Sequence, residues 1–259
     1  MKFKSNNPFL GNKSFTQQGA TTVYDADGRP VNLIDYNNTM SVNGAVNKSF
    51  ILLFVLLASA LFTWYMAFNG QSPIPLAIAG AIIGFVMVLI AVFKPAYSQY
   101  LAPAYALFEG MFIGGVSFIF EAMFPGVVIQ AVGATFVTFI VCFLLYRFKV
   151  VKVTEQFKSI VIAASLAVFT FYIISWLLSW IVGYQPVHYG SSLMSIGISV
   201  AVIVIAALNL FLDFDLIEKG AQKRLPKHME WFGAMGLMIT LVWLYIEFLK
   251  LFAKLAARD

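Results

Sequence analysis

Three acidic residues of this sequence lie inside long apolar segments. Glu109 lies in LAPAYALFEGMFIGG, Asp213 in LNLFLDFDLIEKG, and Glu247 in LVWLYIEFLKLF. An ionised acid at the centre of a bilayer costs roughly 2.5–3.5 kcal/mol even on lenient insertion scales, so such a residue persists only when it is protonated, paired or hydrated. These three residues are therefore the first candidates for proton binding or ion transport.

Two aspartates, Asp213 and Asp215, follow the same apolar run, but they cannot share a helical face. At 100° per residue their side chains lie about 200° apart. Asp215 shares its face with the polar residues Glu218, Lys219 and Gln222. This pattern predicts a solvated stripe at a helix end, with Asp215 and Lys219 as a surface ion pair.

Asp213 instead shares its face with Asn209, and the small and polar surface around them is typical of contact with another helix. Glu247 in the same way aligns with Thr240 and Gly236. We therefore expect Asp213 to face the interior of a helix bundle, with Asn209 and Thr240 as supporting polar residues.

Two carboxylates on different helices can share one proton. The neutral, hydrogen-bonded pair holds the helices together, whereas loss of the proton leaves two anions that repel each other. Their oxygens are then hard ligands of the kind that Ca²⁺ takes in sets of 6–8. Two alternatives remain open: Asp213 lies at the interface and is hydrated, or Glu247 only pairs with Lys250 at i+3.

The composition places these acids in a polytopic membrane protein. The chain of 259 residues is 61% hydrophobic and 11% charged, with a mean hydropathy of +0.85. Soluble domains are nearer 45–50% apolar, with about a quarter of their residues charged. The net charge of +5 indicates basic loops facing anionic lipid rather than nucleic acid. The single cysteine, Cys142, excludes an intrachain disulfide.

Seven apolar stretches are long enough to cross the membrane, which predicts an all-α bundle of seven transmembrane helices. Glycine pairs at i and i+4, Gly80 with Gly84 and Gly110 with Gly114, allow close helix contact. The stretches are Ser49–Phe68, Ile74–Phe93, Tyr100–Phe120, Gly126–Tyr146, Ser159–Val182, Leu193–Leu212 and Gly233–Phe252.

Residues 1–45 form a polar N-terminal tail that we expect to be flexible. A short helix is expected after Thr39 or Ser41, and either residue can cap it. Residues 46–259 form the transmembrane domain. Five Lys and Arg residues precede the first apolar stretch, with Lys48 as the last of them, and the alternate loops carry one, four and four. This asymmetry predicts a cytoplasmic N-terminus. Lys250, Lys254 and Arg258 depart from the pattern if the last segment crosses, which we favour over re-entry of that segment.

Three motifs in order resemble the Bax inhibitor-one-like family, also called transmembrane Bax inhibitor motif proteins, and its bacterial branch in particular. They are LAPAYALFEGMFIGGVSFIFE, AALNLFLDFDLIEKG and HMEWFGAMGLMITLVWLYIEFLKLFAKL. The resemblance implies a seven-helix bundle whose last helix is central and wrapped by the other six. It also implies a pH-sensitive Ca²⁺ leak channel, sensed by a hydrogen-bonded pair of acids on the sixth and seventh helices.

Carried over to this sequence, the sixth-helix acid falls on Asp213, the seventh-helix acid on Glu247, and the third-helix glutamate on Glu109. These residues are then the expected pH sensor and ion pathway, with Asp213 and Glu247 as transient Ca²⁺ ligands. Two departures stand out, because the seventh-helix acid is Glu rather than Asp and the interval between the pair is longer than usual. If the last helix already starts at Trp231, Glu247 lies about 24 Å along it, too far to meet Asp213.

Two other functions remain open beside the leak channel. One is a membrane stress or quality-control protein that binds and modulates other membrane proteins, such as a membrane protease. The other is a proton-coupled transporter with Glu109 as a relay. Motifs of intramembrane and soluble hydrolases are absent from the sequence, and His188 and His228 lie in loops, so we expect no enzyme and no cofactor. The expected partners are membrane lipids, Ca²⁺ as the permeant ion and a membrane protein, in a bacterial inner membrane.

Overall fold

The computed structural model describes residues 20–24, 30–34, 38–183 and 190–258. Within them, seven helices are long and apolar enough to cross a membrane. The shortest has 20 residues, which at 1.5 Å per residue spans about 30 Å. The helices are α1 (Val42–Phe68), α2 (Ile74–Phe93), α3 (Ser98–Met123), α4 (Val127–Arg147), α5 (Glu155–Val182), α6 (Leu193–Gln222) and α7 (Met229–Ala256), with a short 3₁₀ turn, η3 (Pro95–Tyr97), before α3.

The helix boundaries follow from capping side chains and turn residues. The hydroxyls of Ser41, Thr154 and Ser192 accept hydrogen bonds from backbone N–H groups in the first turns of α1, α5 and α6. Gly126 and Gly183, which flank α4 and α5, have positive φ angles, a conformation that glycine adopts without strain. The expected cap at Ser41 is thus confirmed, and the helix that follows it is the first part of α1 rather than a separate element.

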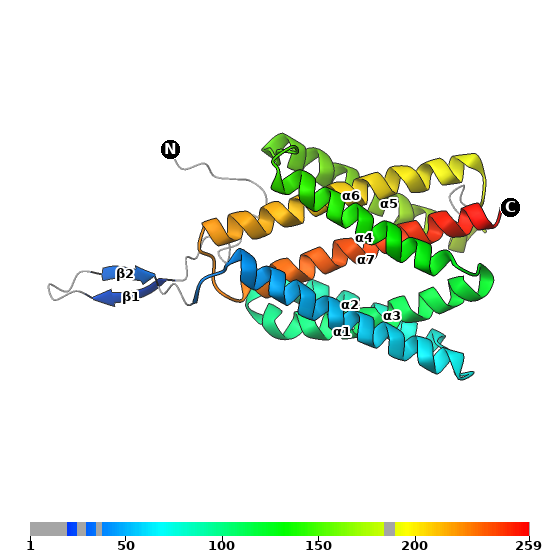
Figure 1. Ribbon diagram of the computed structural model, residues 1–259, viewed down its shortest axis with the longest axis horizontal. Coiled ribbons are helices and arrows are strands. Elements are labelled where there is room, and N and C mark those ends of the chain that lie inside the picture. The colour runs from blue at the N-terminus through cyan, green and yellow to red at the C-terminus, as the bar shows by residue number, and fades with distance from the viewer. Residues whose placement is uncertain (1–19, 25–29, 35–37, 184–189, 259) are drawn as a thin grey trace.

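Helix α7 is the centre of the bundle, as the resemblance implied. In the apolar 18-residue segment of α7, 61% of the residues are buried, and the corresponding segments of the other spanning helices are 39% buried or less. Its main neighbours are α1, α3, α4 and α6, whereas α2 packs on α3, and α5 packs on α6 (Figure 1). The central helix is therefore enclosed mainly by four helices, and α2 and α5 form an outer layer.

The contact of α1 with α3 depends on glycine. An added Cβ at Gly110 would lie 2.3 Å from the carbonyl oxygen of Leu56, and one at Gly114 would lie 2.4 Å from that of Ala60. Gly80 of α2 meets the carbonyl oxygen of Phe108 in the same way, at 2.4 Å. The two glycine pairs seen in the sequence therefore mark helix packing.

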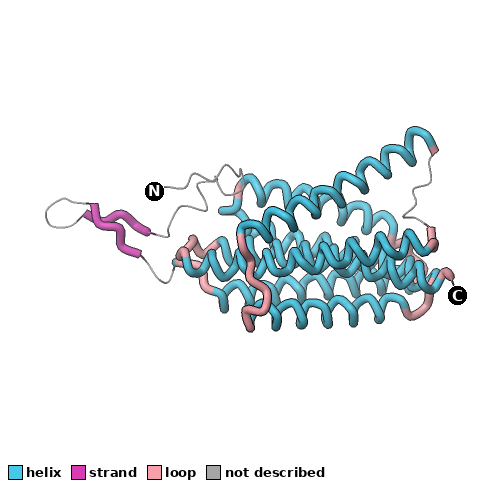
Figure 2. Tube along the Cα trace, turned by 90° about the horizontal axis from the view of Figure 1, so that it is seen from above, coloured by secondary structure: helices cyan, strands magenta, loops and turns pink. Residues whose placement is uncertain are grey.

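Helix α5 diverges from the rest of the bundle toward its C-terminal end. Figure 2 shows this helix rising away from its neighbours toward its C-terminal end. Large apolar side chains there, among them Trp176, Trp180 and Ile181, are exposed in the structure. In a membrane protein such side chains face lipid.

The N-terminal region contains a two-stranded antiparallel hairpin, β1 (Ala20–Tyr24) with β2 (Pro30–Ile34), in which Thr22 pairs with Asn32. The expectation of a flexible tail did not anticipate this hairpin. Figure 1 shows it beyond one end of the helices, opposite the end where α7 finishes.

Residues just before α1 are bound to the loop between α6 and α7. The Met40 N–H donates to the carbonyl of Leu225 at 2.7 Å, and the Lys227 N–H donates to that of Asn38 at 3.1 Å. The Met40 side chain is buried in a small apolar cluster with Ile217 and Leu225. The last residues of the expected tail therefore belong to the packed bundle.

Candidate functional site

Asp213 lies between α6 and α7, as its helical face predicted. Two residues of α7 lie beside it: Gly236, whose added Cβ would be 3.6 Å from Oδ1, and Thr240, whose hydroxyl is close to the carboxylate. Oδ2 of Asp213 is buried and has no hydrogen-bond partner among the described residues. The carboxyl group therefore meets one hydroxyl and no cation within the described bundle.

Asn209 and Thr240 are both polar residues inside the bundle, but they do different things. The Asn209 amide donates to Ser165 Oγ on α5 at 2.7 Å and to the carbonyl of Ile205 at 2.8 Å, so it joins α6 to α5. Thr240, expected on the face of Glu247, is instead the neighbour of Asp213. Only Thr240 contributes directly to the surroundings of the candidate acid.

Glu247 is 1% exposed and is neutralised by its own helix. Lys250 Nζ lies 2.8 Å from Oε1, and the Tyr172 hydroxyl of α5 donates to the carboxylate at 3.2 Å. The alternative reading, in which Glu247 pairs with Lys250, is thus confirmed as the arrangement in the structure.

The expected pair of Asp213 with Glu247 is wrong for a geometric reason. Helix α6 continues to Gln222 and α7 already begins at Met229, so the connection is short and fixes which turns face each other. The turn of α7 opposite Asp213 carries Thr240, and Glu247 lies about 10 Å further along the helix axis. The two carboxylates therefore cannot share a proton or bind one Ca²⁺ together in this structure.

Glu109 belongs to a third location, the interface of α3 with α2. Its Oε2 atom lies 3.0 Å from the position of an added Cβ at Gly84, and the ring of Tyr105 lies beside the same glycine. Glu109 is half-buried and forms no ion pair with the described residues. The three predicted acids are thus separate groups, and not one site.

The prediction that Asp215 is a solvated residue is wrong. Asp215 is 6% exposed, and its Oδ2 atom lies 2.9 Å from Lys219 Nζ and 3.0 Å from Lys158 Nζ. The pairing with Lys219 is confirmed, but Lys158 at the start of α5 also covers this face. A helical wheel of α6 alone cannot show that second helix.

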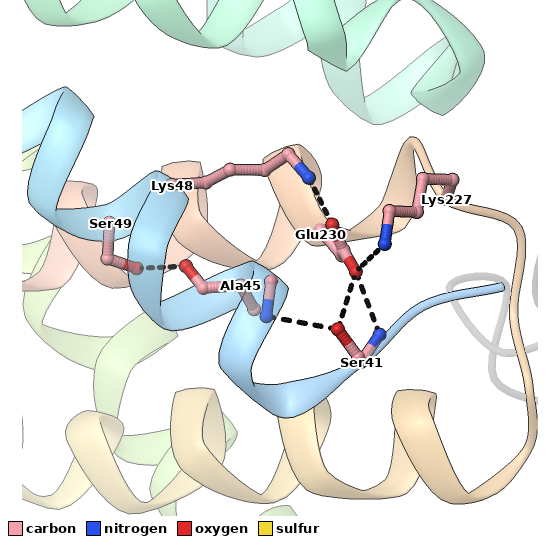
Figure 3. A network of polar contacts seen from close by, with 7 residues as sticks. Ser41, Ala45, Lys48, Ser49, Lys227 and Glu230 are labelled. Atoms are coloured by element: carbon pink, nitrogen blue, oxygen red, sulfur yellow. Dashed lines mark hydrogen bonds and ion pairs between the residues drawn. The ribbon is translucent and has the colours of Figure 1, made fainter. Parts of the chain in front are cut away.

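Glu230 is a buried acid that the sequence analysis did not single out. It is 0% exposed in the first turn of α7, and it accepts hydrogen bonds from the Ser41 N–H at 2.9 Å and the Ser41 hydroxyl at 3.0 Å (Figure 3). Lys227 Nζ lies 2.9 Å from Oε1, and Lys48 of α1 pairs with Oε2. The signal in the sequence was an acid in a first helical turn three residues after a lysine, a position that the helix dipole favours.

The Glu230 network is a clamp and not a reactive group. Both carboxylate oxygens are saturated by cations and donors, and they tie the start of α1 and the α6–α7 loop to α7. Gly44 is required beside it, because an added Cβ would lie 2.2 Å from Glu230 Oε1.

Of the two histidines, His228 is described, and no described contact joins it to the candidate acids. His228, just before α7, is half-buried, and burial lowers its pKa from the ordinary value. Burial therefore favours its neutral form. His188 lies outside the described residues. Among the described residues, no group of three or more His, Cys, Asp and Glu side chains could hold a metal ion.

The fold and the buried acids define a polytopic membrane protein built as a seven-helix bundle around α7. The family model described as Bax inhibitor 1 like matches residues 7–257, and the chain belongs to that family. No curated protein matches the chain.

Proposed function

We propose that this protein is a proton-gated cation leak, with Ca²⁺ as the permeant ion. The observation that carries the proposal is the Asp213 carboxylate, which lies between two spanning helices with one oxygen lacking a described partner. Family membership supports the same function. The proposed gate is the single acid Asp213 beside the Thr240 hydroxyl, and not a pair of carboxylates.

The gating step follows from the charge of Asp213. When the carboxyl group is protonated, it is neutral and the contact between α6 and α7 is stable. When the proton is lost, a negative charge remains in an apolar interior with the Thr240 hydroxyl close to it, and water or a cation stabilises this state. A cation that enters between α6 and α7 meets the carboxylate and hydroxyl oxygens, the ligand types that suit Ca²⁺.

The proposal is tested by Ca²⁺ efflux from proteoliposomes over a range of pH. The wild-type leak is expected to rise with pH, whereas Asp213→Asn, which is neutral at every pH, is expected to give a low leak without pH dependence. Thr240→Val, which removes the donor to the anion, is expected to lower the leak at each pH. Glu155→Gln is the matched control, because the Glu155 side chain is 80% exposed. A pH profile of Asp213→Asn that follows the wild type would refute the proposal.

We also propose that the end of the bundle where α1 begins faces the cytoplasm of a bacterial inner membrane. Lys94, Arg147, Lys152 and Lys223 all lie at this end, which is the distribution that cytoplasmic loops show. In a Cys142→Ala background, an impermeant maleimide added outside cells is expected to label Gln71→Cys and to leave Lys149→Cys unlabelled. The opposite labelling would reverse the assignment.

A groove between α1 and α4 supports a second candidate function, the binding of another membrane protein. This groove has a volume of about 340 Å³ and is lined almost entirely by apolar side chains, among them Leu57, Trp64, Phe136 and Leu241. A transmembrane helix of a partner fits this chemistry. In the efflux experiment, this function predicts no Ca²⁺ flux for any variant.

A further inference from the structure

A second cavity lies at the opposite end of the bundle from the Glu230 network. It has a volume of about 740 Å³ and lies between the divergent part of α5, the end of α3, the residues Gly190 and Ser191 just before α6, and the last turns of α7. Aromatic side chains form its walls, among them Phe120, Phe124, Tyr172 and Trp176.

The charged residues of the cavity lining are two lysines, Lys250 and Lys254, and the described lining includes no carboxylate. Lys250 Nζ is 2.8 Å from Glu247 and 4.8 Å from the centre of the Tyr172 ring. Lys254 Nζ donates to Ser199 Oγ at 2.7 Å and to the carbonyl of Ser195 at 3.3 Å, and it forms no ion pair with the described residues. The two ammonium groups thus face one carboxylate, which leaves a positive charge.

These lysines are also two of the three cations, with Arg258, that do not fit the charge asymmetry of the sequence. The loops at this end, residues 69–73, 124–126 and 183–192, contain no Lys or Arg. A positive charge that departs from this trend, half-buried beside an apolar cavity, is stabilised by an anion. Each ammonium group has three donors, so Lys254 has one and Lys250 has two that these contacts do not use.

The depth and the walls of the cavity indicate what kind of anion it takes. Lys254 lies about 3 Å from the end of α7 at Ala256, at the level where lipid headgroups lie. Trp176 and Trp180 on α5 are exposed at the same end, and tryptophan is enriched at that level of the membrane. Apolar walls beside two ammonium groups suit an amphiphile with a phosphate head better than a free phosphate ion.

We propose that this cavity binds an anionic phospholipid, with Lys250 and Lys254 holding its phosphate and the aromatic walls holding the glycerol and the first part of its chains. Lys254 is the main anchor, because Lys250 is already paired with Glu247. The proposal does not depend on the leak function.

Native mass spectrometry of the full chain in detergent tests this proposal, with phosphatidylglycerol and phosphatidylcholine as probes. The wild type is expected to retain one phosphatidylglycerol in preference to phosphatidylcholine. Lys254→Gln is expected to weaken this binding about tenfold, because one charge-assisted hydrogen bond is lost. Lys254→Arg, which keeps the charge, is expected to retain the lipid. Lys223→Gln, an exposed lysine at the other end, is the matched control and is expected to bind as the wild type does.

Trp176→Ala provides a second variant that keeps both lysines, and it is expected to weaken phosphatidylglycerol binding if Lys254→Gln fails to fold. Equal retention of phosphatidylglycerol by the wild type and both cavity variants would overturn the proposal, as would equal binding of phosphatidylcholine. Displacement of the lipid by millimolar inorganic phosphate would overturn the lipid assignment in favour of a small-anion site.

Discussion

Asp213 and Glu109 differ from the other buried acids of the described bundle in what surrounds their charge. Asp215 and Glu230 each contact two lysines, and Glu247 contacts one. An acid that is paired with lysines joins the elements that carry them, whereas an acid without a cation is costly when ionised. The lysine-paired acids therefore explain how the helices are joined. Asp213 and Glu109, which have no cation, are the acids whose protonation can change the structure.

The Glu230 network yields a prediction about stability that is independent of the leak. Glu230→Gln leaves Lys48 and Lys227 without their counter-charge, and the loss of these charge-assisted hydrogen bonds beside partly exposed lysines costs about 1.5–3 kcal/mol. We therefore expect a clear fall in the thermal unfolding midpoint in detergent, followed by intrinsic tryptophan fluorescence. Glu155→Gln serves as the control, since that side chain is 80% exposed. Identical midpoints for the two variants would show that the network does not stabilise the bundle.

At the scale of elements, the connection between α6 and α7 decides which residues meet. Residues 223–228 form a tight loop in which Arg224 has a φ of 52° and the Leu225 side chain is buried. This short loop sets the axial position of α7 relative to α6. The proximity of Asp213 to Thr240 therefore follows from the loop, and not from a hydrogen bond between Asp213 and Glu247. This register is why a carboxylate further along α7 remains free to pair with Lys250 instead.

The contact of α1 with α3 yields a prediction from matched glycines. Gly110→Ala would place a Cβ 2.3 Å from the Leu56 carbonyl, so the helices must separate, which we expect to cost about 1–3 kcal/mol. Gly133→Ala in α4 makes the same chemical change where nothing lies within 4 Å, and it should be neutral or slightly stabilising. Thermal midpoints of both variants in detergent check this. A fall in the midpoint of Gly133→Ala equal to that of Gly110→Ala would contradict the assigned contact.

At the scale of the whole molecule, apolar length and charge asymmetry predicted the seven helices and their alternating direction. The boundaries differ mainly where polar residues continue a helix, as in α6, which extends from the expected Leu212 to Gln222. The site was less predictable, because a helical wheel describes one helix in isolation. It placed Asp213 correctly, but the partner of each acid depends on a neighbouring helix: Lys158 of α5 for Asp215, and Thr240 rather than Glu247 for Asp213.

The boundary between the tail and the bundle yields the last prediction. Met40 is buried against Ile217 and Leu225, and Ser41 both caps α1 and donates to Glu230, so residues from Asn38 onward belong to the packed unit. A variant that begins at Asn38, after an initiator methionine, is expected to keep the thermal midpoint of the full chain.

A variant that begins at Val42 loses the cap, worth about 1 kcal/mol, together with two hydrogen bonds to Glu230 and the burial of Met40, and we expect its midpoint to fall by several degrees. Ser41→Ala in the full chain separates the two effects, because it removes the cap and one hydrogen bond but keeps Met40 in place. Its midpoint should therefore lie between those of the two truncated variants. Equal midpoints for the two truncations would mean that the segment before α1 lies on the bundle without stabilising it.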